Sequence, residues 1–249
     1  MKPWQTAVRY GAIVLAVILI INIASWGLKI VGAVLGVASS GTLDESKSYE
    51  CDADTDRLEI DISAARLIIR VEKCESITVK TNLKGVSVKE RSNTLKINDN
   101  NNKGFLSVSD TEGFVEIMIP EGAVLREIDL DLGAGETLLS AICADEVDID
   151  GGAGEVLFTR CEISKLDLDM GVGALDFRGR ITGKADISLG VGKTDITLLG
   201  GKDKYRIVLE KGIGEIKVDG ETVGNTKLGE GECTVDIDGG VGEINIKFE

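Results

Sequence analysis

The sequence predicts an all-β fold: a single-stranded right-handed parallel β-helix, or β-solenoid, of about 19 residues per coil, preceded by an N-terminal transmembrane helix. Two observations indicate the solenoid: Gly-x-Gly pairs recur at a regular spacing, and apolar residues alternate with acids around them. A long apolar run indicates the helix. We therefore expect residues 1–9 to be a cytoplasmic N-terminus, 10–37 a transmembrane anchor, 38–56 a linker and 57–249 the β-solenoid domain.

The anchor is predicted from residues 10–28, which are almost uninterruptedly apolar. A helix of this length rises roughly 28 Å, close to the hydrocarbon thickness of a bilayer. Lys2 and Arg9 precede the run. The positive-inside bias then places the N-terminus in the cytoplasm and the large remainder outside. A cleaved signal peptide is the alternative, because residues 37–40 offer the small side chains that cleavage requires.

The part of the domain that precedes the regular repeats follows the same alternation less cleanly. Residues 58–65 resemble a repeat unit whose glycines are replaced, and the alternation returns at residues 77–80 and 94–97. Residues 98–104 are rich in Asn and are expected to form a turn or loop. Residues 114–120 are expected to form a strand that a proline ends.

The glycine pairs recur along the second half of the chain. They lie at residues 133/135, 152/154, 171/173, 190/192, 212/214 and 240/242, with spacings of 19, 19, 19, 22 and 28 residues. Self-similarity at a fixed period predicts a solenoid, since each unit can bury its apolar face only against its neighbours. The widest spacing predicts a protruding loop at residues 217–233, and the last unit is expected to form an exposed end coil.

Each unit holds two alternating strands joined at the glycine pair, and alternation turns one set of side chains inward. In the second strand the inward set is expected to stack as one column: Leu139, Phe158, Phe177, Ile196, Val218 and Ile246. The residue between the glycines is always apolar and is expected to point inward at the corner: Ala134, Ala153, Val172, Val191, Ile213 and Val241. Glycine permits the positive φ or close backbone approach that such a corner needs.

Acidic residues of the first strand are expected to stack outward in two columns. The first column contains Asp129, Asp148, Asp167 and Asp186, and the second contains Asp131, Asp150 and Asp169. Neighbouring coils lie about 4.8 Å apart, so adjacent charges repel by about 1 kcal/mol in water. Two interpretations stay open: a solvated face that keeps the solenoid soluble, or a face that binds a hard cation such as Ca²⁺.

Charge and composition exclude several function classes. The chain contains no histidine. The residues beyond 43 include all 42 acidic residues and 25 basic ones, so this part carries a net charge of about −17. Such a surface repels nucleic acid phosphates. The glycine pairs lack the third glycine and the following helix of a dinucleotide site. No catalytic constellation stands out, so we expect no enzyme, no catalytic, cofactor-binding or metal residues, no cofactor and no small-molecule substrate.

Five cysteines are present, and none forms the Cys-x-x-Cys pair of a zinc site. Cys143 and Cys161 lie nearly one coil apart, and Cys51 and Cys74 flank the first strand of the domain. Either pair could form a disulfide in an exported domain, with small buried thiols as the alternative. Cys233 has no evident partner in the sequence.

Three motifs, taken in order, resemble a known family. They are Val-Glu-Ile-Met-Ile-Pro at residues 115–120, Ile-Asp-Leu-Asp-Leu-Gly-Ala-Gly-Glu at 128–136 and the terminal Gly-Val-Gly-Glu-Ile-Asn-Ile at 240–246. Together they resemble the bacterial DUF4097 family of β-strand-repeat proteins, over residues 58–249. The resemblance implies a right-handed β-helix that is often linked to a membrane, and an adhesin label that was itself inferred from shape. The family has no established catalytic residues, and some members lie near envelope-stress regulators.

The expected function is therefore that of a non-enzymatic interaction or adhesin-like module with a role in envelope stress sensing. It would span the plasma membrane once, with its C-terminal domain extracytoplasmic. Its expected partners are the membrane, through the N-terminal helix, and a protein or cell-envelope component. The alternative is a cytoplasmic, membrane-attached β-helical scaffold that polymerises end to end.

Overall fold

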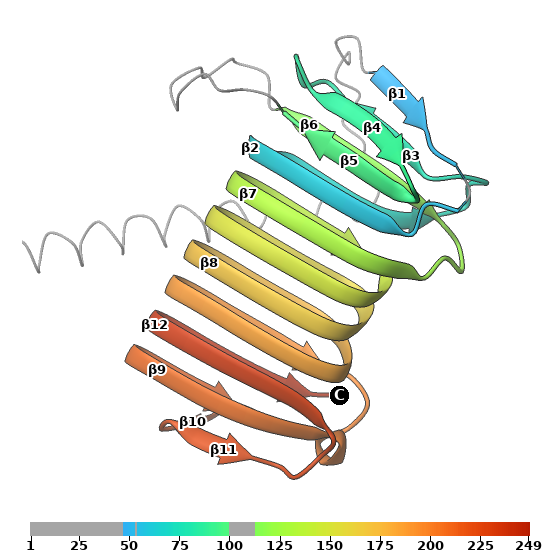
Figure 1. The fold of residues 1–249 in the computed structure, drawn as a ribbon. Coiled ribbons are helices and arrows are strands. Elements are labelled where there is room, and N and C mark those ends of the chain that lie inside the picture. The colour runs from blue at the N-terminus through green and yellow to red at the C-terminus, as the bar shows by residue number, and fades with distance from the viewer. Residues whose placement is uncertain (1–46, 53, 100–112) are drawn as a thin grey trace, which may run out of the picture.

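The computed structural model describes residues 47–52, 54–99 and 113–249, and within them nearly all regular structure is β-strand. Figure 1 shows the strands stacked as successive coils of one elongated solenoid. The predicted all-β solenoid is therefore confirmed. Among the described residues, no helix is long and apolar enough to cross a membrane. The anchor predicted at residues 10–37 lies outside the described residues.

In the described part of the chain, twelve strands form one sheet, and a single 3-10 turn (Lys202–Lys204) interrupts them. The strands are β1 (Lys47–Glu50), β2 (Arg57–Glu72), β3 (Thr78–Thr81), β4 (Ser87–Arg91), β5 (Thr94–Asn98), β6 (Phe114–Pro120), β7 (Leu125–Ser140), β8 (Cys143–Leu198), β9 (Tyr205–Val218), β10 (Glu221–Val223), β11 (Thr226–Leu228) and β12 (Cys233–Phe248). β1 falls within the segment expected to be a linker, and it pairs antiparallel with β3.

The coil length follows from the strand register. β7 pairs in parallel with β8, and Leu125 and Ser140 lie opposite residues that come 19 positions later in the chain. β8 alone is 56 residues long, so it continues for nearly three such periods. Figure 1 shows each ribbon passing along the front of the solenoid and returning behind it.

The predicted inward column is buried throughout. Its six members are between 0% and 7% exposed, the largest value being that of Val218. The rings of Phe158 and Phe177 lie on successive coils, with their centroids 5.3 Å apart. Each such burial contributes about 1.5–3 kcal/mol, so this column is a main source of stability.

The prediction for the corner residue is wrong, because the residue between the glycines points outward. Ile213 is 60% exposed and Val241 is 39% exposed, and the other four members are exposed or half-buried. In an unbroken strand, side chains on one face are an even number of residues apart. Leu130 and Thr137 both point inward although they are an odd number of residues apart, so the alternation shifts by one residue at the bend. The middle residue of the bend consequently lies on its outer side.

The second glycine of each pair has the role that the sequence predicted. These six glycines have φ between +138° and +159°, as Gly173 does at +159°. A Cβ built on Gly173 would lie 1.8 Å from the carbonyl oxygen of Gly154 on the adjacent coil. Only a residue without a side chain permits this approach, so the glycine column sets the tight stacking of the corners.

The coils at both ends of the solenoid do not follow the order of the chain. β12 lies between β8 and β9, so β9 forms the end coil. At the other end β2 lies between β7 and the pair β5 and β6. The expectation that the last unit of the sequence forms the exposed end is therefore wrong, since an alternating Gly-x-Gly unit can pair equally well at either position.

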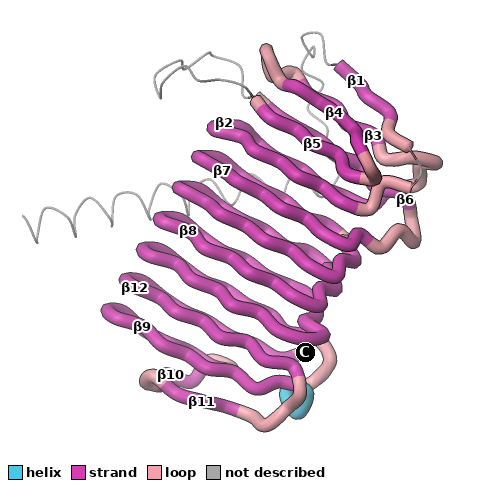
Figure 2. The backbone as a smooth tube through the Cα atoms, in the orientation of Figure 1, coloured by secondary structure: helices cyan, strands magenta, loops and turns pink. Residues whose placement is uncertain are grey.

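Antiparallel strands cap both end coils, and Figure 2 shows most of the loops gathered at these ends. β10 and β11 pair with the outer edge of β9, so the segment expected to protrude at residues 217–233 instead lies along that edge. Between the two strands, Asn225 covers the corner: its side chain accepts a hydrogen bond from the Lys211 N–H (3.3 Å) and donates one to the Lys211 carbonyl (3.4 Å). At the opposite end β3 pairs with β6, and β4 pairs with β5.

Candidate binding surface

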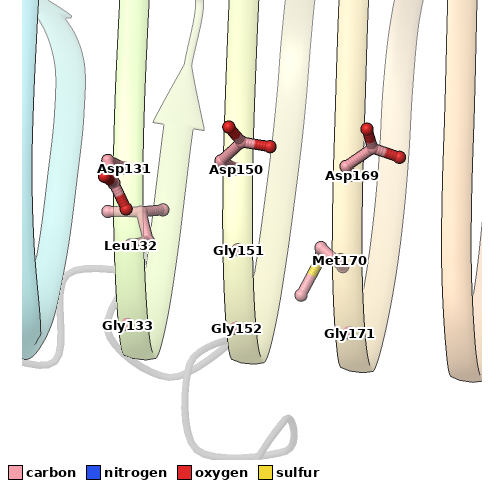
Figure 3. A pocket seen from close by; sticks show the side chains of 9 residues that line it. All are labelled: Asp131, Leu132, Gly133, Asp150, Gly151, Gly152, Asp169, Met170 and Gly171. Atoms are coloured by element: carbon pink, nitrogen blue, oxygen red, sulfur yellow. The ribbon is translucent and has the colours of Figure 1, made fainter.

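The aspartates of the first strand lie in the two columns that the sequence predicted. The parallel register places Asp129 opposite Asp148 and Asp131 opposite Asp150. Figure 3 shows Asp169 on the next strand beside Asp150. Further register pairs extend both columns: Glu59 with Asp129, Asp61 with Asp131, and Asp186 with Asp236. One side of the solenoid therefore carries two parallel rows of carboxylates.

The charges within these rows act on one another. Burial raises the pKa of Asp129 above its ordinary value, and nearby acids, Glu59 first among them, raise it further. Burial also raises the pKa of Asp148, followed by the charges of Asp167 and Asp129, whereas Lys165 opposes the shift. Both carboxylates therefore bear the like-charge repulsion that the stacking predicts.

A shallow hollow of about 390 Å³ lies where the second carboxylate row meets the glycine corner. Nine residues from three successive coils line it: Asp131, Leu132, Gly133, Asp150, Gly151, Gly152, Asp169, Met170 and Gly171. Figure 3 shows the three aspartates side by side along it, with the Leu132 and Met170 side chains below them. The hollow thus combines an acidic rim with an apolar floor.

Gly151 creates this hollow. It pairs with Leu132, so it occupies a position that a larger apolar side chain fills on the neighbouring coil. A Cβ on Gly151 would lie 3.1 Å from Cγ of Met170, which shows that Met170 partly fills the space. Sequence reasoning missed the hollow, although the signal was present: the unit reads Asp-Gly-Gly at residues 150–152, where the preceding unit reads Asp-Leu-Gly.

A second acidic group, which sequence reasoning did not single out, lies just after the glycine corner. Glu136 pairs with Glu155, and Nε of Arg66 lies 2.9 Å from Oε2 of Glu136. Burial raises the pKa of Glu155, and the charges of Glu136 and Asp176 raise it further. The position after each glycine pair was the available signal, because it is acidic in several units.

The acids are arranged in rows and do not converge on a point. Within the part of the chain that the structure describes, no group of three or more His, Cys, Asp or Glu side chains could hold a metal ion. The Ca²⁺ interpretation of the columns therefore stays a prediction.

All five cysteines are free thiols, so the structure contains neither of the two disulfides considered above. Burial raises the pKa of Cys161 to about 11, and its Sγ lies 3.4 Å from the carbonyl oxygen of Leu139. Burial also raises the pKa of Cys51 to about 11, with Glu90 adding to the shift. Thiols held in the protonated form in this way are poor nucleophiles, as expected of buried structural cysteines.

Comparisons with known proteins agree with this architecture. Residues 55–249 match the family model described as Toastrack DUF4097. No curated protein matches the chain. A solved structure of a candidate cell adhesion protein from Clostridium sporogenes is 20% identical, with a TM-score of 0.53, over 82% of this chain and 99% of that one.

A candidate adhesin from Bacteroides fragilis is 14% identical, with a TM-score of 0.46, over 83% of this chain and 98% of that one. The likeness to the Clostridium structure shows a shared fold. The family model covers nearly all of the described solenoid, and the resemblance inferred from the sequence is confirmed. The chain belongs to the DUF4097, or Toastrack, family.

Proposed function

We propose that this chain is a non-enzymatic, adhesin-like interaction module that binds a macromolecular partner through its carboxylate rows. The observation that carries the proposal is the register itself, which fixes acids such as Asp131 and Asp150 side by side on a rigid sheet. A regular, extended, charged face is suited to recognising another surface. The Clostridium protein of the same fold is described as a candidate cell adhesion protein, which supports the same reading.

The chemistry of the hollow favours binding over catalysis. Its charged groups are the carboxylates of Asp131, Asp150 and Asp169, and its other lining residues are Leu132, Met170 and glycines. A catalytic site needs groups in different roles, such as a nucleophile beside a base or two acids with well-separated pKa values. Three exposed carboxylates in equivalent positions supply one role only.

Display outside the cell is the second part of the proposal. Residues 10–37 would anchor the chain, with the solenoid extracytoplasmic and the N-terminus inside. The described chain begins at β1, which lies at one end of the strand order, whereas β9 and its cap lie at the other. An anchor that precedes β1 would hold the first end near the membrane and direct the β9 end away from it, a suitable arrangement for sensing the envelope or contacting a neighbouring surface.

Protease treatment of intact cells tests the location. An extracytoplasmic solenoid is removed by an external protease, whereas a cytoplasmic one is spared until the cells are lysed. Protection in intact cells, together with digestion after lysis, would contradict the proposal.

The polymerising scaffold is the alternative, and the caps argue against it. End-to-end growth needs a long, uncovered strand edge at each end of the solenoid, whereas the outermost strands here (β1, β4, β10 and β11) are only three to five residues long. β10 and β11 lie on the edge of β9, and β3 and β4 lie on the edges of β6 and β5. Electron microscopy of the purified full-length chain should therefore show no filaments.

Site-specific photocross-linking in living cells tests the binding face. A photoreactive residue replacing Asp150, in the carboxylate row, is expected to capture a discrete macromolecular partner. The matched control replaces Thr222, which is exposed on the β10 cap and distant along the strand order from the hollow. Equal capture at both positions, or none at position 150, would refute the assignment of the face.

A further inference from the structure

The last strand of the chain holds the end coil in place. β12 pairs in parallel with β8 along one edge, from Thr234 to Phe248, and with β9 along the other, from Cys233 to Ile246. The described pairings of β9 are with β10, β11 and β12, and it does not pair with β8. The end coil and its cap are therefore joined to the rest of the sheet through β12, as Figure 1 shows.

Without β12, the two neighbouring strands would form a slot of defined shape. The slot would bury alternating apolar side chains, since Val235, Ile237, Ile244 and Ile246 are at most 3% exposed in the complete structure. It also requires a Gly-x-Gly corner, because a Cβ on Gly242 would lie 1.7 Å from the carbonyl oxygen of Gly192. β12 itself, or β12 of a second copy, meets both requirements.

The hinge that leads into β12 is short and tightly placed. Residues 229–232 connect β11, on the outer edge of β9, to β12 on the inner edge, and so must cross the start of β9. Gly229 has φ +74°, and a Cβ on it would lie 2.1 Å from the carbonyl oxygen of Tyr205. A Cβ on Gly231 would lie 2.0 Å from the carbonyl carbon of Lys204. The closed arrangement therefore depends on glycine at this crossing.

Exchange between two copies would keep every pairing of β12 and release the hinge from this crossing. The interactions within the slot are the same whether the strand comes from the same chain or from another, so the hinge and the protein concentration decide between the two arrangements. Short, constrained hinges favour exchange. The long register of β12 makes spontaneous release after folding slow, so exchange would take place mainly while the chain folds.

We propose that β12 is an exchangeable strand, and that the slot between β8 and β9 accepts β12 from a second copy of this chain. The product is a dimer in which two solenoids swap the strand that holds their end coils. This association is distinct from binding through the carboxylate rows, so either proposal can fail without the other.

Substitution in the hinge tests the exchange in the full-length, detergent-solubilised chain. Gly231→Ala introduces a side chain that the closed crossing cannot hold, whereas an extended hinge can. Light scattering should show at least a tenfold rise in the ratio of dimer to monomer, with an unchanged β-sheet circular dichroism spectrum. The matched control is Gly224→Ala in the same cap, where a Cβ would meet no atom within 4 Å and the dimer ratio should not change. A Gly231→Ala variant that is folded and monomeric would overturn the proposal.

A peptide competition tests whether the slot accepts β12 from another chain, even if the hinge variant fails to fold. The full-length wild-type chain is refolded with about a hundredfold excess of a fluorescent peptide of residues 233–249, and unbound peptide is removed by gel filtration. The peptide should stay bound at least ten times more than a control peptide carrying Ile244→Asp and Ile246→Asp, whose side chains belong in the core. Equal retention of the two peptides, or retention of neither, would show that the slot does not accept a foreign strand.

Discussion

At the residue scale, alternation in the sequence is a reliable guide along straight strands and fails where the backbone bends. Phe158 and Phe177 were predicted to point inward and are buried. Ile213 was predicted to do the same and is 60% exposed, because the bend shifts the alternation by one residue. The sequence shows that a glycine corner is present, but the side to which its middle residue turns depends on backbone angles that residue types alone do not specify.

The glycine column gives the first prediction. Gly173→Ala should destabilise the domain by about 3 kcal/mol or more, because the new Cβ meets a backbone oxygen and φ is +159°. The urea midpoint of unfolding measures the change. Gly224→Ala, where a side chain has open space, should change the free energy of unfolding by less than about 0.5 kcal/mol. A small effect at Gly173 would mean that the coils can separate at the corner.

The carboxylate rows give the second prediction. The folded-state pKa of Asp148 is raised, so the folded chain binds more protons than the unfolded chain as the pH falls toward the ordinary aspartate range. Ionised Asp148 therefore lowers stability at neutral pH, and this penalty disappears on acidification below that range. Asp148→Asn should raise stability at pH 7 by about 0.5 kcal/mol, a small value because solvent screens this largely exposed group.

Thermal melting at two pH values checks this expectation. The gain from Asp148→Asn should be present at pH 7 and should shrink as the pH falls through the ordinary aspartate range, because the raised pKa makes the folded chain take up this proton before the unfolded chain does. Asp203→Asn is the control, because Asp203 is exposed on the 3-10 turn, outside both rows. A gain that persists unchanged at the lower pH would have a cause other than charge.

At the scale of the element, the sequence predicts each coil but not the order in which the coils stack. The units of β9 and β12 carry the same alternation and the same glycine corner, so either can pair with β8. Their positions are settled by the connecting segments: β10 and β11 occupy the outer edge of β9 and leave its inner edge for β12. Such a choice depends on pairings between distant parts of the chain, which local patterns do not encode.

The aromatic pair in the core column gives the third prediction. Phe158 is fully buried, with its ring centroid 5.3 Å from that of Phe177 on the next coil. Phe158→Ala should cost about 3–5 kcal/mol, since closely packed coils cannot collapse around the cavity. Phe158→Leu should cost much less, because it retains most of the apolar volume. Denaturant unfolding of both variants provides the comparison, and similar losses for the two would contradict a packing origin.

At the scale of the whole molecule, the dominant physical feature is a rigid sheet that carries a large negative charge. The chain has a net charge of −14, and its acids lie in rows whose members repel one another. Mobile ions screen such repulsion, with a Debye length that falls from about 30 Å at 0.01 M to about 3 Å at 1 M salt. The folded state holds its charges closer together than the unfolded chain does, so added salt should stabilise it.

The fourth prediction uses this screening to separate the two interpretations of the carboxylate rows. If the rows form a solvated face, NaCl and CaCl₂ at equal ionic strength should raise the melting temperature by similar amounts, about 2–4 °C between 0.02 and 0.5 M. If the rows bind Ca²⁺ specifically, CaCl₂ should give an additional rise that saturates with concentration, since a ligand of the folded state stabilises it by mass action. We expect the first outcome, because carboxylates in rows do not enclose a cation as a converging ligand set does.

A variant with Asp131→Asn, Asp150→Asn and Asp169→Asn should then melt higher than the wild type at low salt and respond less to either salt. A saturating effect of Ca²⁺ that this variant abolishes would instead assign a cation site to the hollow.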